Sequence, residues 1–590
     1  MTDRHPRRDN SFAPIEDYAV LGDGRSVALV ATDGQIDWWP VPTLDSPPVC
    51  AALLDPERGG FFVLRPVDDF EVRRHYLEGT NVLESEYITA TGMVRVTESL
   101  NSGDRGPLPW TELVRRVEGL EGAVELCWEL VPGDRFGQAQ PSVTWHAGVP
   151  LLHVGDQMLT VVTEGCEPTE AGRRQLSGRV QCTAGSLAVV VAVATDDEPL
   201  FLPSPSAALD RLDGTVQSWR RWSGQVSAGG QWSREVQRSA LALKLLLYEP
   251  AGSFAAAATT SLPEQIGGSK NWDYRYAWVR DSSFALDALI DLGLHQEVHH
   301  SVSWLLNALR QSNPDLYAFY RLSGAVADEE AELDVQGYHG SRPVRSGNSA
   351  ANQLQLGVYG TLFDTISRYV REGHVIDPDT ASLLTRLADQ CCGLWRSRDS
   401  GLWELGDLQH YTISKVGCWA ALERAAQLAD SGLLPPIHQD RWRSEASRIK
   451  SWIHEHCWSS DKKAWTFYPG TERLDAAVLL MGRAGFDVGP RLSTTIDAVR
   501  RELAEGPYIY RYSGMKQEEG AFIACTFWMI EALSCVGRRA EARSLMEEAV
   551  GMVNDVGLLS EQINPLSGAF LGNFPQGLSH LALINAVHSL

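Results

Sequence analysis

The first third of the chain alternates between short apolar runs and turn residues. Many of the runs follow the every-second-residue alternation of a strand with one buried face. Turn dipeptides such as Asp23-Gly24 and Asp33-Gly34 separate neighbouring runs. This spacing is typical of an antiparallel β-sandwich, and the clearest strand candidates are residues 26–31, 34–39, 61–64, 93–96, 151–154 and 187–194.

After about residue 231 the apolar period changes to that of an amphipathic helix. The pattern predicts about twelve helices, near residues 233–248, 281–293, 295–311, 348–371, 378–396, 412–432, 436–456, 472–484, 490–504, 519–536, 538–554 and 577–589. This number permits six helical hairpins closed into a ring. An irregular α-solenoid would give the same count, although the sequence shows no internal repeat to support one.

The change of period, together with the charged first residues and a Pro- and Gly-bearing linker, divides the chain into four parts. We expect a mobile, charged tail over residues 1–14, a β-sandwich domain over 15–197, a linker with one helix over 198–230, and a helical domain over 231–590. The Pro-bearing run FLPSPS and the turn Ala228-Gly229-Gly230 mark the linker. The predicted fold class is therefore multidomain α and β.

The acidic net charge of the chain argues against some classes of binding partner. The chain has 52 Lys and Arg against 75 Asp and Glu, a formal net charge of −23, and no basic run stands out. Nucleic acid and anionic membranes are therefore not expected as partners. The sequence leaves the oligomeric state open, a homo-oligomer included.

The cysteines and the N-terminal residues bear on location. The ten cysteines are scattered without a CxxC pair, which is typical of reduced thiols. The first residues lack the apolar stretch of a signal peptide, and the longest apolar run, 187–194, is too short to span a bilayer. We expect a cytoplasmic protein.

Residues 259–293 gather aromatic and charged side chains more densely than a plain core segment would. After a Gly267-Gly268 turn come Trp272, Asp273, Tyr274, Arg275, Tyr276, Trp278, Arg280 and Asp281. Aromatic rings can stack on a sugar while Arg and Asp hydrogen-bond its hydroxyls. Helical spacing follows, so this cluster is predicted at the rim of a helical scaffold. The alternative is a buried aromatic core with a surface Arg280–Asp281 pair.

Two glutamates lie in aromatic or Gly-rich loops ahead of predicted helices. Glu404 stands between Trp403 and Leu405, apolar neighbours that would raise its pKa and keep it protonated. Glu561 stands between Ser560 and Gln562, polar neighbours that favour its ionised form. Glycoside hydrolysis needs one carboxyl of each kind. Taken singly, each glutamate is better explained as a solvated loop acid than as a catalytic group.

The chain resembles bacterial glycoside hydrolase family 15 in five long motifs that occur in family order: NWDYRYAWVRDSSF, GYHGSRPVRSGNSAANQLQLGVYG, SGLWELGDLQHYTISKVGCWAALERA, YRYSGMKQEEGAFIACTFW and SEQINPLSGAFLGNFPQGLSHLALINA. The opening, IEDYAVLGDGRSVALVATDGQIDWW, is similar to the N-terminal domain of trehalase-like and glucoamylase-like members. The resemblance implies a β-sandwich followed by an (α/α)6 barrel catalytic domain. It also implies an inverting, exo-acting α-glucosidase without a metal or cofactor.

The resemblance further implies roles for matching residues. Glu404 would be the general acid and Glu561 the general base. The sugar-binding residues would be Tyr274, Arg280, Asp281 and Arg511 around the terminal glucose, Trp278 and Trp403 in the pocket wall, and Arg342 and Arg345 at its mouth. Inversion requires room for a water molecule, so we expect the two carboxyls to lie roughly 6.5–9.5 Å apart.

Several substrates fit this resemblance. The first expectation is an α-glucoside or gluco-oligosaccharide, cut in the manner of a glucoamylase or an isomalto-oligosaccharide glucohydrolase with release of β-D-glucose. An α,α-trehalase is the next alternative, and a phosphorylase is disfavoured because phosphate would leave Glu561 without a task. A catalytically idle carbohydrate-binding or sensing protein is the alternative of another class.

Overall fold

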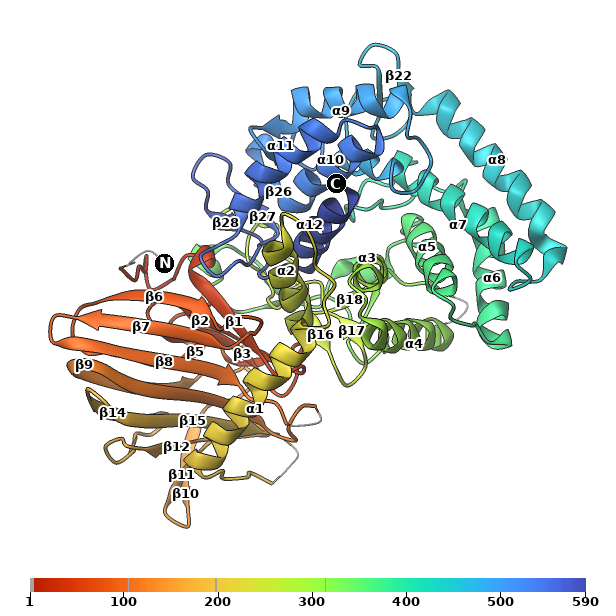
Figure 1. Cartoon of the computed structure of the whole chain (residues 1–590). Coiled ribbons are helices and arrows are strands. Elements are labelled where there is room, and N and C mark those ends of the chain that lie inside the picture. The colour runs from red at the N-terminus through yellow and green to blue at the C-terminus, as the bar shows by residue number, and fades with distance from the viewer. Residues whose placement is uncertain (1–4, 104–105, 197–198, 313–314) are drawn as a thin grey trace.

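The computed structural model describes residues 5–103, 106–196, 199–312 and 315–590. Within these residues fifteen strands form the N-terminal part and twelve α-helices follow. Figure 1 shows the strands gathered on one side of the molecule and most helices on the other. The predicted combination of a β-sandwich and a helical domain is confirmed. None of the helices in the described ranges is both long and apolar enough to cross a membrane.

The sandwich consists of two antiparallel layers that share one long strand, β9 (Thr111–Pro132). Its first half pairs with β8 and β15, and its second half pairs with β5 and β14. The other strands are β1 (Tyr18–Gly22), β2 (Val27–Ala31), β3 (Gln35–Pro40), β4 (Pro48–Cys50), β5 (Gly60–Pro66), β6 (Phe70–Tyr76), β7 (Leu83–Thr89), β8 (Gly92–Leu100), β10 (Ser142–His146), β11 (Val149–Val154), β12 (Gln157–Glu164), β13 (Glu170–Ala171), β14 (Leu176–Thr183) and β15 (Leu187–Thr195).

Two glycines let β9 pass between the layers. A Cβ added at Gly119 would lie 2.0 Å from the Thr183 carbonyl oxygen. Gly122 has a φ of 62°, a conformation that costs glycine little. The strand therefore changes layers between these two positions.

The helices are α1 (Pro205–Ser223), α2 (Ser233–Leu246), α3 (Val279–Asp291), α4 (His295–Ser312), α5 (Gly357–Arg371), α6 (Pro378–Leu394), α7 (Thr412–Asp430), α8 (Gln439–His456), α9 (Pro490–Leu503), α10 (Ile523–Cys535), α11 (Arg539–Ala549) and α12 (Gly577–Ser589). Helix α1 packs against the sandwich, where Ala208 and Leu212 cover valines of β9 and β15.

The remaining helices form a closed double ring. The inner ring runs α3, α5, α7, the 3₁₀ helix η5 (Ala476–Met481), α10 and α12, and α12 packs back on α3. Helices α2, α4, α6, α8, α9 and α11 pack outside it. This closure is the (α/α)6 barrel, and it excludes the open solenoid. Inner helices such as α10 and α12 are buried on nearly all sides, because both neighbours and the barrel axis cover them.

One inner element differs from the helical pattern. The predicted helix over 472–484 is a 3₁₀ helix of six residues, Ala476–Met481. Asp475, the residue before it, is extended; the Leu474 carbonyl accepts from the Ser513 amide, the Leu474 amide donates to the Ser513 hydroxyl, and Gly485 adopts a φ of 73°. The segment therefore has helical geometry only between these two points.

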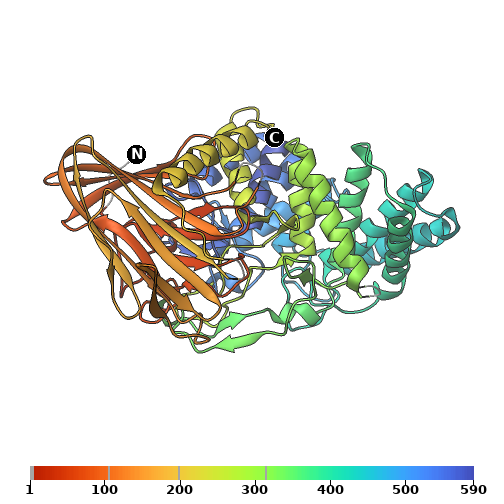
Figure 2. The ribbon, with the colours of Figure 1, turned by 90° about the horizontal axis from the view of Figure 1, so that it is seen from below.

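Short strands connect the helices: β16 (Leu247–Tyr248), β17 (Ser253–Phe254), β18 (Ala277–Trp278), β19 (Phe319–Tyr320), β20 (Ala331–Leu333), β21 (Val344–Ser346), β22 (Trp458–Ser459), β23 (Ala464–Trp465), β24 (Ala504–Glu505), β25 (Tyr508–Ile509), β26 (Ala521–Phe522), β27 (Gln562–Ile563) and β28 (Phe570–Leu571). Figure 2 shows that the sandwich abuts one side of the barrel.

The expected mobile tail needs correction. Phe12 is buried and packs edge-on against Tyr338 of the helical domain, and Arg8 forms ion pairs with Asp33 and Asp37. Arg8 and Phe12 thus anchor this segment to the rest of the protein. Residues 1–4 of the predicted tail lie outside the described residues.

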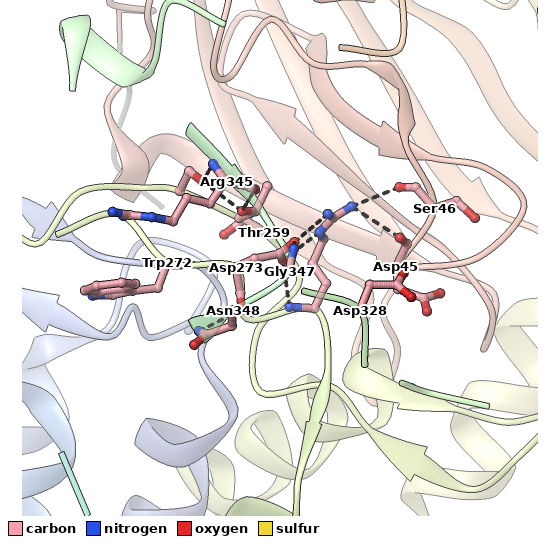
Figure 3. Close-up of polar contacts among 12 residues, drawn as sticks. Asp45, Ser46, Thr259, Trp272, Asp273, Asp328, Arg345, Gly347 and Asn348 are labelled. Carbon is pink, nitrogen blue, oxygen red and sulfur yellow. Dashed lines mark hydrogen bonds and ion pairs between the residues drawn. The ribbon is translucent and has the colours of Figure 1, made fainter. Parts of the chain in front are cut away.

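Buried polar contacts join the sandwich to the barrel (Figure 3). Arg275 forms a two-pronged ion pair with Asp273, with N–O distances of 2.9 and 2.7 Å, and also donates to the Ser46 carbonyl at 3.0 Å. The same Asp273 accepts from the Gly347 amide. A loop of the sandwich is thereby tied to the segment that leads into α3.

We expect Arg275→Met to destabilise the protein strongly. The substitution leaves the fully buried Asp273 without its positive partner, which costs about 3–5 kcal/mol. Calorimetry should record a fall of several degrees in Tm. The matched control is Arg58→Met, since Arg58 also reaches the helical part through Asp334 but is 46% exposed; its effect should stay within about 1 kcal/mol. Equal shifts for the two variants would contradict this account of the interface.

Candidate active site

A cavity lies at the end of the barrel where the inner helices α3, α10 and α12 begin. The residues that line it are Ala256, Tyr274, Trp278, Arg280, Asp281, Leu402, Trp403, Glu404, Arg511, Phe522, Glu561, Gln576 and Leu578. They come from loops or helix starts far apart in the sequence, which ring closure brings together. Eight of the ten residues singled out from the sequence are among them.

Glu404 occupies a strained position in the loop between α6 and α7. Its φ is 60°, a conformation that non-glycine residues adopt only when their surroundings impose it. The Trp278 indole Nε1 donates to the Glu404 carboxylate at 2.6 Å, and Arg280 Nη1 lies 3.7 Å from it. Burial raises the pKa of Glu404, and Arg280 opposes that shift. The raised pKa agrees with the sequence prediction.

Arg280 is fixed by its neighbours before any ligand arrives. Its guanidinium forms hydrogen bonds of 2.8 and 3.2 Å to Asp281 and one of 2.8 Å to the Leu402 carbonyl. The pair is part-buried in the wall of the cavity, so the alternative of an exposed surface pair is wrong. A pre-oriented guanidinium loses little side-chain entropy when it binds a hydroxyl.

Glu561 is buried more deeply than its sequence neighbours indicate. It is 1% exposed, and the Asn573 amide donates to Oε2 at 3.1 Å. The Ser560 hydroxyl donates to the Gln562 carbonyl rather than to Glu561. Burial raises the pKa of Glu561 to about 7, although Arg511 and Tyr274 oppose the shift. Buried contacts, rather than its polar sequence neighbours, therefore determine the protonation of Glu561.

Gly572 makes room for the Glu561 carboxylate. Its φ is 70°, and a Cβ at this position would lie 2.3 Å from Glu561 Oε2. The next residue, Asn573, is fully buried and also hydrogen-bonds Thr259 and the Trp272 carbonyl. The position of Glu561 therefore depends on this short turn.

Trp403 and Arg511 form another side of the cavity. The Trp403 indole donates to the buried Asp475 at 2.8 Å, and the Arg511 guanidinium lies 5.6 Å from the Trp403 ring centroid. Arg511 pairs with Glu264 at 2.6 Å and with Glu519 at 2.7 Å. Its charge is thus shared between two carboxyls.

Sequence reasoning missed these carboxyl partners. Glu264 lies in the aromatic-rich stretch, and Glu519 is the first residue of a predicted helix, so neither stands out by its local pattern. Asp475 lies in a segment that was noted only as a helix. Their roles depend on contacts across the ring, which no local pattern of the sequence signals.

Arg342 and Arg345 do not line this cavity. Arg342 donates to the Gln336 carbonyl. Arg345 pairs with Glu330 at 3.1 Å, donates to the Asn271 carbonyl and stacks on Trp272 at 4.5 Å (Figure 3). Through these contacts Arg345 stabilises the segment before α3.

The described residues contain no group of three or more His, Cys, Asp or Glu side chains placed to hold a metal ion. The arrangement at the cavity is instead the buried carboxyl of Glu561 and the part-buried carboxyl of Glu404, both with raised pKa values, together with fixed guanidinium groups and aromatic walls. Such a site can bind a polar, ring-shaped ligand and exchange protons with it.

Known proteins are similar to this chain in sequence and in fold. The model for "Glycosyl hydrolases family 15" matches residues 232–588, and that for "Trehalase-like, N-terminal" matches residues 7–169. A protein named trehalase from Thermoplasma volcanium is 32% identical, with 98% of this chain and 94% of the relative covered. One from Mycobacterium tuberculosis, also named trehalase, is 35% identical, with 98% and 90% covered.

The fold has a counterpart among solved structures. A bacterial glucoamylase complexed with acarbose superposes with a TM-score of 0.73, covering 100% of this chain and 97% of its own, at 12% sequence identity. This likeness concerns the fold alone. Together with the family match over most of the helical domain, the findings show that the chain belongs to glycosyl hydrolases family 15 and is a glycoside hydrolase.

Proposed function

We propose that this chain is an α,α-trehalase that works with inversion at the attacked carbon. The observation that carries the proposal is its similarity to proteins named trehalase over nearly its whole length, at 32% and 35% identity. Sequence reasoning placed glucoamylase or isomalto-oligosaccharide activity first and trehalase second. The similarity to proteins named trehalase favours trehalase activity over the other two.

Glu404 is the proposed general acid. A carboxyl that must protonate a leaving oxygen has to keep its proton near neutral pH, which requires a raised pKa. Burial raises the pKa of Glu404. Trp278 holds the carboxyl in one orientation through its 2.6 Å hydrogen bond. The proton would pass to the glycosidic oxygen as the bond to the anomeric carbon breaks.

Glu561 is the proposed general base. It takes a proton from a water molecule, whose oxygen bonds to the anomeric carbon on the face opposite the leaving sugar. From trehalose, this inversion yields one β-D-glucose from the attacked unit and one α-D-glucose from the departing unit. Glu404 and Glu561 thereby exchange protonation states and return to the start through solvent.

The remaining cavity residues would hold the glucose being attacked. Tyr274, Trp278 and Trp403 offer aromatic surface to a pyranose ring. Arg280 with Asp281, and Arg511, offer charged groups to its hydroxyls, and charge-assisted hydrogen bonds are the stronger ones. Since each group is already fixed by protein contacts, little ordering is left for binding.

Glucose release from a sugar panel tests the function. We expect trehalose to be cut with a higher kcat/KM than maltose, isomaltose, nigerose, maltotriose or isomaltotriose, and proton NMR to record equal initial amounts of α- and β-glucose. Only α-glucose from trehalose would overturn inversion. A preference for maltose or isomaltose would return the assignment to a glucoamylase or isomalto-oligosaccharide hydrolase, and binding without cleavage would indicate an idle protein.

The catalytic carboxyls are tested by Glu404→Gln and Glu561→Gln. Each should lower kcat by several orders of magnitude with a much smaller effect on KM, since the amide keeps the shape but cannot exchange the proton. The matched control is Glu518→Gln, because Glu518 is 56% exposed and outside the cavity lining. Substantial activity in either of the first two variants would contradict its assigned role.

We expect kcat/KM for the preferred sugar to depend on pH in a bell shape. Glu561 must be ionised, so activity should fall as the pH drops below its pKa of about 7. Glu404 must be protonated, so activity should fall again as the pH rises through its raised pKa. Initial rates across pH check this, and an acid limb near the ordinary pKa of glutamate would contradict the buried state of Glu561.

Gly572→Ala should reduce kcat by about a hundredfold, the effect of a displacement of roughly 1 Å in a catalytic group. The new Cβ would push the Glu561 carboxylate out of place. Gly568→Ala is the matched control, because Gly568 has a similar φ of 76° and no atom within 4 Å of the added Cβ. Equal losses of activity would show that backbone strain, not the carboxylate clash, is responsible.

A further inference from the structure

A short extended segment with two glutamines runs beside the loop that carries Glu404. The segment has the sequence NQLQLG and leads into α5. Gln353 has a φ of −85° and a ψ of 142°, and alternate side chains of an extended chain point to the same side. The Leu354 carbonyl accepts from the Ser400 amide at 2.9 Å. Gln353 and Gln355 therefore project from one side of a segment whose main chain is tied to the loop.

The two side-chain amides form a chain of hydrogen bonds that ends at the backbone of Glu404. Gln353 Nε2 donates to the Glu404 carbonyl at 3.0 Å, and Gln355 Nε2 donates to Gln353 Oε1 at 3.3 Å. A carbonyl can only accept, so Gln353 must turn its NH2 group to Glu404 and its oxygen to Gln355. Among the described residues, Gln353 is the only hydrogen-bond donor to this carbonyl.

Gln355 also acts on the side chain of Glu404. It is buried, and its hydrogen bond to the Glu404 carboxylate is among the contacts that oppose the rise in the pKa of this acid. One segment therefore contacts both the backbone and the carboxyl of the proposed general acid.

Glu404 needs such contacts because its backbone is strained. Its φ is 60°, and a non-glycine residue keeps this conformation only where its surroundings impose it. Arg280 holds the Leu402 carbonyl at 2.8 Å, and the Leu405 amide donates to another carbonyl of the loop at 2.9 Å. These bonds hold the peptide groups on either side, whereas the bond from Gln353 holds the carbonyl of Glu404 itself.

The backbone conformation decides where the Glu404 carboxyl points. In the left-handed form the carboxyl lies 2.6 Å from the Trp278 indole nitrogen and 3.7 Å from Arg280 Nη1. A rotation of φ to the usual negative range would swing Cβ, and the carboxyl with it, away from these two groups. A general acid must lie within hydrogen-bond reach of the oxygen that it protonates, so the rotated acid could not serve the substrate.

We propose that Gln353 is a positioning residue for the general acid: it holds the left-handed backbone of Glu404, and Gln355 fixes its amide in the orientation that this requires. The inference rests on the proposed role of Glu404. Neither glutamine is among the described residues that line the cavity, so Gln353 acts through Glu404 rather than on the sugar.

Gln353→Met tests the effect on catalysis. Methionine has a similar length and no charge, but it cannot make either hydrogen bond. We expect kcat for the preferred sugar to fall by about tenfold or more while KM changes by less than about twofold, because the sugar-binding groups stay in place and only the proton donor is displaced. An unchanged kcat would overturn the proposal.

The matched control is Gln439→Met. Gln439 also donates its side-chain amide to a carbonyl, that of Ala426, at 3.2 Å, and this bond joins α8 to α7. Here kcat and KM should both stay within about twofold of the wild type, and thermal unfolding should show that both variants are folded. An equal loss of kcat in the control would overturn the proposal, because the loss of any such amide bond would then be enough.

A double variant shows whether Gln353 acts through Glu404. When Gln353→Met is added to Glu404→Gln, kcat should fall by less than about twofold further, because no proton donor is left to position. A general packing defect would instead lower kcat by the same factor in both backgrounds. A further tenfold fall in the double variant would therefore contradict the assigned role.

The position of Glu404 can also be observed without catalysis. In a crystal structure of Gln353→Met, φ of Glu404 should leave the left-handed region, and its carboxyl should lie more than about 3.5 Å from the Trp278 indole nitrogen, beyond hydrogen-bond range. A left-handed Glu404 that keeps its bond to Trp278 would overturn the inference.

These outcomes separate the two proposals. If the wild type cuts no sugar but Glu404 rotates in Gln353→Met, the proposed function fails and the hold of Gln353 on Glu404 stands. If the wild type is active but Glu404 does not rotate in the variant, only the inference about Gln353 fails.

Discussion

The protonation of the acids in the proposed active site depends on which of them contact a guanidinium group. Arg280 serves Asp281 and stands 3.7 Å from Glu404, while Arg511 is divided between Glu264 and Glu519. A carboxyl with a full partner is stabilised as an anion, and one with a partial partner holds its proton more tightly. The contacts of Arg280 and Arg511 therefore help to give the acids of the site their different proposed roles.

The sequence predicted what depends on local pattern. Alternation and helical period gave the two kinds of domain, and long motifs led to Glu404, Glu561 and the residues before α3. The protonation of Glu561 could not be derived from Ser560 and Gln562, because its environment comes from Asn573, Arg511 and the depth of the cavity. Glu264 was missed for the same reason: the contact that matters joins it to Arg511, 247 positions along the chain.

The sandwich contributes to the site although the described cavity lining contains none of its residues. Arg275 ties the Ser46 loop to Asp273, and Trp38 donates to the Ala258 carbonyl next to Thr259. Thr259 in turn contacts Asn573, whose amide holds Glu561. The N-terminal domain therefore supports the loop that carries the proposed base through a short series of buried hydrogen bonds.

Closure of the inner ring also determines when the enzyme can first become active during its synthesis. Helix α12 is the element that packs back on α3, and Glu561 lies just before it. Until α12 has emerged from the ribosome, the barrel has an open seam and the two glutamates lack a common cavity. A nascent chain thus has its proposed acid more than a hundred residues before its proposed base, and the proposed site is incomplete until α12 has been synthesised and has packed on α3.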